Sequence, residues 1–378
     1  MDAVFAVTPR VYQFDALRGF AVLMILFANI FAFAFPLELS ENTDIFTQQS
    51  SLSQLQHQFY LVFIRGKFIC LLTLLFGASL YLLWHQAQYP DTRLKARMLA
   101  LLVLGACHAV FVWPGDILFV YAVTGTGLLM QQVFRWSSEQ QLRYAKAYML
   151  AGLALPTLVW LLPSSQSLEQ KSITQLIDIY TGPYTGQLWQ QIKYFLLLLV
   201  DLVFISYWWF GGVMLLAIWG MQQDWQQLLK QQTNTLLCIA FGIVLIPKLF
   251  SDAASANALP MPLKFVSDLS FALLYVRLFI WCLALSPWLT RLLVNCGRCA
   301  LSLYLWQSIC MVLLFRWVCP QCFGTMDRTS LSWIAVIFTL LQLFIVQRYY
   351  QPGQLWWFER LYRQLANSIE TKLLKNPG

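Results

Sequence analysis

A histidine and an aspartate lie on either side of a tight turn in an otherwise apolar stretch of the chain. His108 and Asp116 flank the run Trp113-Pro114-Gly115, inside a segment from Gly105 to Gly125 that is almost wholly apolar. Ionisable groups at the edge of hydrocarbon are costly, and by default they mark a functional site. A carboxylate can orient an imidazole, and a neutral imidazole can take a proton from an attacking hydroxyl or amine. The alternative is a histidine that is simply hydrogen-bonded in the packing of the protein.

The composition indicates the elements that must position this pair. Hydrophobic residues make up 59% of the 378 residues and charged residues only 11%. A soluble domain carries about 25% charged residues, so we predict a polytopic membrane protein in contact with a lipid bilayer. The formal net charge is +8, but the Lys and Arg residues are scattered between apolar runs and form no patch, so nucleic acid is a poor partner.

The apolar runs predict the fold. A spanning helix needs roughly 20 mostly apolar residues, and about ten such runs are present. We therefore expect an all-α membrane helix bundle. The runs centre on residues 16–36, 60–84, 98–114, 117–134, 144–162, 194–219, 235–250, 266–286, 298–318 and 331–347.

The loops predict the orientation and the division of the chain. Alternate loops are rich in Lys and Arg, whereas the loop from Leu37 to Gln58 has none and carries Glu38, Glu41 and Asp44. The positive-inside rule then places both termini in the cytoplasm. We expect an N-terminal half of five helices (1–163), an extracytoplasmic loop (164–193), a second half of five helices (194–350) and a cytoplasmic amphipathic tail (351–378).

A series of short motifs resembles one family. The motifs are Phe14-Asp-Ala-Leu-Arg-Gly-Phe-Ala21 with Asn29, Gly66-Lys-Phe68 with Leu75-Phe-Gly77, Gly105-x-x-His108 with Gly115-Asp-Ile-Leu118 and Tyr121, and Gly297-Arg-Cys-Ala-Leu-Ser-x-Tyr304 with Gln307-Ser308. In this order they resemble the YeiB-like family of bacterial inner-membrane proteins, whose C-terminal half is a domain of unknown function. The chain departs from the family's Gly-Pro-x-Glu-Trp-like stretch, because it reads Gly353-Gln-Leu-Trp-Trp357 there.

The resemblance implies a candidate activity. The family is grouped remotely with transmembrane acyltransferases such as heparan-α-glucosaminide N-acetyltransferase, which pass an acyl group from cytoplasmic acyl-CoA to an acceptor on the far side. By this resemblance no cofactor is bound, acyl-CoA is the donor, and a small molecule or glycan is the acceptor. His108 is the base or acyl carrier, Asp116 orients it, and Lys67 stabilises the oxyanion.

Polar residues of the first helix and the second apolar run are candidates for binding the donor. Asp15, Arg18 and Asn29 lie on one face of a helix, where Arg18 would contact a phosphate or the pantetheine arm. A structural ion pair between Asp15 and Arg18 is the alternative. Arg65 and Lys67 are either snorkelling cations or a cationic wall for an anionic group.

Further polar residues occur in the second half. Asp201 and Arg277 lie within apolar runs, and each is expensive alone in lipid, so we expect them to form an interhelical ion pair. Tyr304 and Gln307 share a helix face, where they either join helices by hydrogen bonds or line a substrate path.

Nine cysteines include two CxxC pairs. Cys296 and Cys299 fall on the predicted cytoplasmic side, where thiols stay reduced, whereas Cys319 and Cys322 fall outside and could form a disulfide. We expect no metal site, because two CxxC motifs do not occur on one side of the membrane. A transporter with a polar path, or a scaffold without chemistry, remains an alternative to the acyltransferase, and the oligomeric state is left open.

Overall fold

The computed structural model describes residues 12–37, 51–161, 170–250 and 261–375, and within these ranges it is helical and contains no strand. The predicted all-α class is therefore confirmed. The elements are α1 (Tyr12–Ala34), α2 (Ser51–Phe59), η2 (Tyr60–Ile64), α3 (Lys67–Gln86), α4 (Pro90–Phe111), α5 (Leu118–Met130), η3 (Val133–Arg135), α6 (Ser138–Leu161), α7 (Gln170–Thr181), α8 (Tyr184–Asp201), η4 (Leu202–Ser206), α9 (Tyr207–Gly220), α10 (Trp225–Phe250), α11 (Met261–Leu285), α12 (Pro287–Arg298), α13 (Ala300–Leu313), η5 (Leu314–Val318), η6 (Pro320–Cys322), α14 (Arg328–Tyr349) and α15 (Trp357–Lys375).

Several of these helices are long and apolar enough to cross a membrane. Within the described ranges there are seven, and α5 is a shorter apolar helix. They are Tyr12–Ala34, Ser53–Gln86, Pro90–Phe111, Tyr184–Gly220, Met261–Cys282, Ala300–Val318 and Arg328–Tyr349. Helix also covers each of the ten predicted runs, but the count of ten spans and the cytoplasmic placement of the termini stay predictions.

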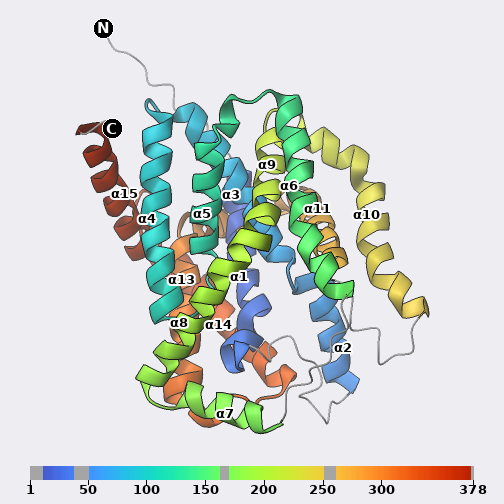
Figure 1. Ribbon diagram of the computed structural model, residues 1–378, viewed down its shortest axis with the longest axis vertical. Helices are drawn as coiled ribbons and strands as arrows, with labels where there is room; N and C mark the ends of the chain where they lie inside the picture. The colour runs from blue at the N-terminus through green and yellow to red at the C-terminus, as the bar shows by residue number, and fades with distance from the viewer. Residues whose placement is uncertain (1–11, 38–50, 162–169, 251–260, 376–378) are drawn as a thin grey trace.

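Helix α1 lies at the centre of the bundle (Figure 1). It packs against α3, α11, α12, α13 and α14, so the predicted N-terminal and C-terminal halves contact each other along its length. Its side chains are apolar on nearly every face, and a helix that is hydrophobic all round is buried. The core around it draws on α1, α3, α9, α11, α12 and α13.

The two ends of the bundle hold different elements. One end, drawn at the top of Figure 1, holds the start of α4 and the end of α5; we call it the arginine end, after Arg18, Arg97 and Arg298. Helices α2 and α7 lie at the opposite end. The acidic residues Glu38, Glu41 and Asp44, on which the predicted orientation partly depends, lie outside the described residues.

The region predicted as a long loop is largely helical. Residues Gln170–Thr181 form α7, and α8 begins at Tyr184 directly after Pro183. Helix α8 buries Gln187 and Gln191, so its polar side chains interrupt the apolar pattern by which a span is recognised from sequence. Helix α12 was likewise not predicted, because it is short and its apolar residues occupy only one face.

Helix α15, the predicted amphipathic tail, packs against α4 and α13. It runs beside α4 at the arginine end (Figure 1). The hydroxyl of Tyr362 reaches the carbonyl oxygen of Arg97 at 3.5 Å. The tail is therefore docked on the bundle.

Candidate functional site

His108 and Asp116 are in contact at the junction of two helices. His108 lies in the last turn of α4, and Asp116 precedes the first turn of α5. Nδ1 of His108 is 2.8 Å from Oδ1 of Asp116, and the two side chains are 2% and 0% exposed. The backbone N–H of Phe119 donates to the other carboxylate oxygen at 2.7 Å, which fixes the Asp116 side chain.

This contact determines the role of each imidazole nitrogen. A carboxylate accepts hydrogen bonds, so Nδ1 of His108 carries the proton and donates to Asp116. Nε2 of His108 is buried and has no hydrogen-bond partner within the described part of the chain. In the neutral ring Nε2 bears a lone pair, so the pair has the arrangement of a general base held by a carboxylate.

Gly105 allows the two helices to bring this pair together. It lies one turn before His108 on α4, and a Cβ atom built on it would be 2.3 Å from the backbone nitrogen of Phe119. Any larger residue would push α5 away from α4. The same backbone nitrogen holds Asp116, so Gly105 and the His108–Asp116 contact depend on one close approach.

Tyr304 of α13 completes the buried cluster. Its hydroxyl donates to Oδ1 of Asp116 at 3.5 Å and accepts from the backbone N–H of Ile117 at 3.4 Å. The centres of the Tyr304 and His108 rings are 5.4 Å apart. Both hydrogen bonds are long, so Tyr304 is held less tightly than Asp116.

Tyr304 also lines a cavity that opens toward the arginine end. The cavity has a volume of about 320 Å³ and lies between α1, α3, α4, α5, α13 and α15. We call it the arginine-lined cavity. Arg18, Arg97 and Arg298 lie among its walls, and Tyr121 and Tyr304 line it as well. His108 does not line it, but Tyr304, which does, lies beside the imidazole.

The arginines are organised by hydrogen bonds and ion pairs. Arg18 lies 3.2 Å from Oδ1 of Asp15 and donates to Ser79 Oγ at 2.7 Å. Arg298 lies 3.6 Å from the other oxygen of Asp15. The predicted pair of Asp15 and Arg18 is thus present, and one carboxylate serves two guanidinium groups that remain partly exposed.

Glu359 of α15 lines the same cavity and was not predicted as a site residue. Its carboxylate accepts from the backbone N–H of Ser302 at 2.9 Å and from the Ser302 hydroxyl. Burial raises the pKa of Glu359 above its ordinary value. The carboxyl therefore opposes the arginine charge less than a fully ionised group would.

The structure does not bring Lys67 to His108, which corrects its predicted role beside an oxyanion. Its ammonium lies 2.8 Å from Asp268 of α11 and donates to the carbonyl of Leu61 at 2.9 Å. Gly66, with φ of 77°, makes room for this pair, because a Cβ there would lie 1.9 Å from Asp268 Oδ2. A paired ammonium in a separate cluster is not placed to stabilise charge at the histidine.

Three further candidates for donor binding lie away from the arginine-lined cavity. Gln307 donates to the carbonyl of Val22 at 3.0 Å and to Gln342 at 2.9 Å, so it joins α13 to α1 and α14. Asn29 is half-buried on α1, and Arg65 follows η2 at the break before α3. The structural alternative for Gln307 is therefore the one observed.

The predicted ion pair of Asp201 and Arg277 is also corrected. Asp201, at the end of α8, accepts from the hydroxyl of Ser206, one turn further along the chain. Arg277 lies on α11 beside a different, largely aromatic pocket that includes Phe241 and Trp281. The local hydrogen bond from Ser206 reduces the cost of the Asp201 carboxyl without the long-range pairing that its sequence position suggested.

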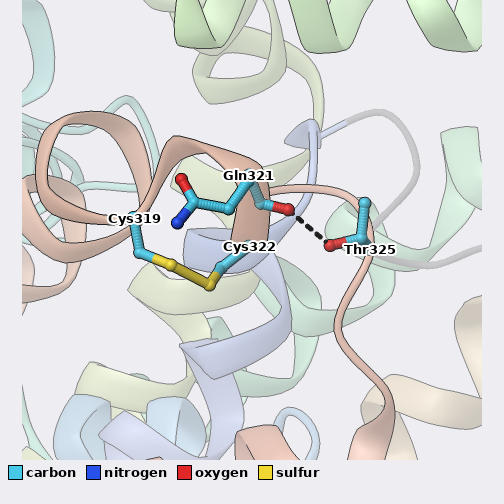
Figure 2. Close-up of a disulfide and its surroundings, with 4 residues drawn as sticks. All are labelled: Cys319, Gln321, Cys322 and Thr325. Atoms are coloured by element: carbon cyan, nitrogen blue, oxygen red, sulfur yellow. Dashed lines mark hydrogen bonds between the residues drawn. A yellow bond between two sulfur atoms is a disulfide. The ribbon is translucent and has the colours of Figure 1, made fainter.

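The second CxxC pair forms a disulfide. Cys319 and Cys322 are bonded in the turn between η5 and α14 (Figure 2). Figure 2 also shows the hydroxyl of Thr325 donating to the carbonyl oxygen of Gln321, at 2.7 Å. The bond lies at the end of η5, on the side predicted to be extracytoplasmic. No group of three His, Cys, Asp or Glu side chains that could hold a metal ion occurs in the described ranges.

These features define a polytopic helical membrane protein with a buried polar cluster joined to an arginine-lined cavity. Residues 221–368 match the family described as a protein of unknown function, DUF418. The chain is 26% identical to the uncharacterized protein YeiB of Escherichia coli over 93% of its own length and 95% of that protein. These likenesses to the DUF418 model and to YeiB agree with the family that its motifs resemble.

Two further relatives match a smaller part. The uncharacterized protein YxaH of Bacillus subtilis and an uncharacterized 39.9 kDa protein encoded in the amylase 3′ region of Bacillus acidopullulyticus are each 30% identical over 38% of the chain. The match spans 39% of the length of each of these two proteins. No solved structure matches the chain.

Proposed function

We propose that this protein transfers an acyl group from acyl-CoA, bound at the arginine end, to an acceptor hydroxyl or amine at His108. The observation that carries the proposal is the continuity of one cavity, from three arginines to Tyr304 beside the His108–Asp116 pair. On the predicted orientation the arginine end faces the cytoplasm, where acyl-CoA is found.

The chemistry of the cavity suits the donor. Guanidinium groups bind phosphate through paired hydrogen bonds, so Arg18, Arg97 and Arg298 are suited to the phosphates of CoA. A volume of about 320 Å³ is at the small end of ligand pockets. The pantetheine arm and a short acyl group match that size, and the nucleotide would remain at the mouth.

The proposed step uses Nε2 of His108 as the base. The acceptor oxygen or nitrogen attacks the thioester carbonyl, and its proton passes to Nε2. The carbon–sulfur bond then breaks, a carbon–oxygen or carbon–nitrogen bond remains, and the CoA thiolate takes the proton back from the imidazolium. Asp116 stabilises the imidazolium in between. Because Tyr304 lines the cavity beside His108, we expect its side chain to turn aside for the thioester to arrive.

The first test is donor binding by the purified full-length protein. A ligand that prefers the folded state raises the thermal unfolding midpoint. We expect acetyl-CoA or a longer acyl-CoA to raise it, and Arg298→Gln to reduce that shift. Arg291→Gln, on the exposed side of α12, is the matched control and should keep the shift. No shift with any donor well above a plausible dissociation constant would refute the donor.

The second test is transfer itself. Inverted membrane vesicles given labelled acetyl-CoA should accumulate label on a lumenal product, and His108→Gln should abolish this while leaving the donor-dependent stabilisation intact. Unchanged transfer in His108→Gln would refute the proposed base.

A second candidate function is proton-coupled transport, favoured by the Lys67–Asp268 ion pair. Buried ionisable pairs inside membranes mark ion and proton pathways as well as enzyme sites. Counterflow of a labelled solute in proteoliposomes without covalent change to it, lost in Asp268→Asn, would favour the transporter over the enzyme.

A further inference from the structure

A second cavity lies toward the other end of α1. It has a volume of about 450 Å³ and is bounded by α1, by α2 with η2, and by the start of α14. None of its lining residues lines the arginine-lined cavity. The second cavity is therefore separate from the His108 cluster, and a ligand bound there would not depend on the proposed acyl transfer.

His57 of α2 places a buried imidazole in the wall of this cavity. The residue is 7% exposed and lines the cavity. Neither ring nitrogen has a hydrogen-bond partner among the described residues. Buried polar atoms without partners are rare in proteins, and each costs about 1–3 kcal/mol unless water or a ligand meets it. A ligand that supplies a hydrogen-bond acceptor would satisfy His57.

Arg328 gives the same cavity a cation. It is 4% exposed, at the first residue of α14, and its guanidinium carbon lies 4.8 Å above the centre of the Phe31 ring. Arginine donates in a planar fork that matches carboxylate and phosphate oxygens. The described lining includes this arginine, His57, Gln56 and Ser332, all of which can donate hydrogen bonds. The polar chemistry of the cavity therefore suits an anion.

The remaining walls are apolar and open toward the surface of the bundle. Leu55 and Phe59 line the cavity and are both more than half exposed. Phe27, Ile30 and Phe31 of α1 form the wall behind them. In a chain that crosses the bilayer, exposed apolar side chains beside a cavity meet lipid tails, so the occupant also has an apolar part.

We propose that this cavity binds an anionic amphiphile. Its phosphate or carboxylate head group lies against His57 and Arg328, and its hydrocarbon chain leaves between Leu55 and Phe59 into the bilayer. A head group alone would leave the apolar wall uncovered, and a hydrocarbon chain alone would leave His57 unsatisfied.

The test uses the full-length protein in a neutral detergent and three probes. These are dihexanoyl phosphatidic acid, dihexanoyl phosphatidylcholine and glycerol 3-phosphate. Binding is measured by native mass spectrometry and by the shift of the thermal unfolding midpoint. We expect phosphatidic acid to bind, and the other two to bind at least tenfold more weakly. Equal binding of phosphatidylcholine would refute the anionic head group, and equal binding of glycerol 3-phosphate would refute the amphiphile.

Variants locate the binding. His57→Ala and Arg328→Gln should each weaken phosphatidic acid binding by about tenfold or more, because each removes a hydrogen bond to a charged group. Arg348→Gln is the control, since this exposed arginine lies at the other end of the same helix. Unweakened binding in His57→Ala would overturn the site.

A third variant covers the case in which loss of a buried group unfolds the protein. Leu55 is exposed, so Leu55→Glu removes little packing and places a carboxylate at the rim of the cavity. We expect it to weaken phosphatidic acid binding while the circular dichroism spectrum stays unchanged. Unweakened binding in a folded Leu55→Glu protein would overturn the proposal.

Discussion

The hydroxyl of Tyr304 lies 3.5 Å from Oδ1 of Asp116, although the two residues are 188 positions apart in the chain. The contact joins the turn between α4 and α5 to α13, in the second half of the protein. One aromatic side chain thus both lines the arginine-lined cavity and contacts the carboxylate that holds His108. We therefore predict that access from the cavity to the imidazole depends on Tyr304.

Replacing Tyr304 tests this dependence directly. Tyr304→Phe removes two long hydrogen bonds, so we expect a loss of stability of about 1 kcal/mol and an intact barrier. Tyr304→Ala removes the ring and should join the cavity to His108. Diethyl pyrocarbonate should then modify His108 much faster than in the wild type, as followed by peptide mass spectrometry. Equal modification rates in all three proteins would show that Tyr304 does not control access.

The charge of Asp116 can be removed with little change of shape. Asp116→Asn keeps an oxygen that can accept from His108, but it no longer stabilises an imidazolium. We expect acyl transfer to fall by roughly 10²- to 10⁴-fold. The thermal unfolding midpoint should fall, because the amide nitrogen replaces one of the two acceptor oxygens, whereas donor binding should change little. Asp327→Asn, at the exposed start of α14, serves as the control and should keep full activity. Wild-type transfer by Asp116→Asn would exclude the carboxylate from the mechanism.

The Lys67–Asp268 pair should behave as a buried structural pair if it takes no part in transfer. Removing one partner leaves a buried charge, so Lys67→Met should cost about 3–5 kcal/mol of stability. The double variant Lys67→Met/Asp268→Leu should regain most of that loss, because neither charge then remains. Unfolding of all three proteins under one set of conditions measures this. Loss of function in a stably folded double variant would instead indicate a role in proton movement.

Glu359 should make the stability of the folded protein, in which α15 docks on the bundle, decrease as pH rises. Burial raises its pKa, so the folded protein binds this proton more tightly than the unfolded chain. The contribution is fully present below the ordinary pKa of 4.5 and is lost as pH rises through the raised value. Glu359→Gln keeps an acceptor for Ser302 and does not titrate. The stability of the wild type relative to Glu359→Gln should therefore fall as pH rises, as measured by thermal unfolding across a pH series. A difference that stays constant with pH would contradict this.

The parts of the site that lie close together in sequence could be predicted. His108 and Asp116 are separated by one turn, so their contact follows from local spacing. Asp15 and Arg18 are three residues apart on one helix, and their pair follows in the same way. The CxxC spacing of Cys319 and Cys322 likewise allowed a disulfide to be anticipated.

The parts that depend on packing between distant helices could not. Nothing in the spacing of Lys67 indicates that Asp268 is its partner, because α3 and α11 meet only in the folded bundle. In the sequence, Arg97 counted only as one charge of a loop rich in Lys and Arg, and Glu359 only as part of the amphipathic tail. Both reach the cavity because α15 docks on α4, a contact that hydropathy does not reveal.

The bond between Cys319 and Cys322 provides a way to distinguish molecules of this protein inserted in opposite directions. Such a bond forms in oxidising compartments and is rare in the cytosol, where thiols are kept reduced. On the predicted orientation, a chain inserted in the reverse direction would therefore carry two more free thiols than one whose η5–α14 turn lies outside the cytoplasm. The presence or absence of this disulfide thus shows which compartment the η5–α14 turn reached during assembly. A count of free thiols distinguishes the two directions of insertion.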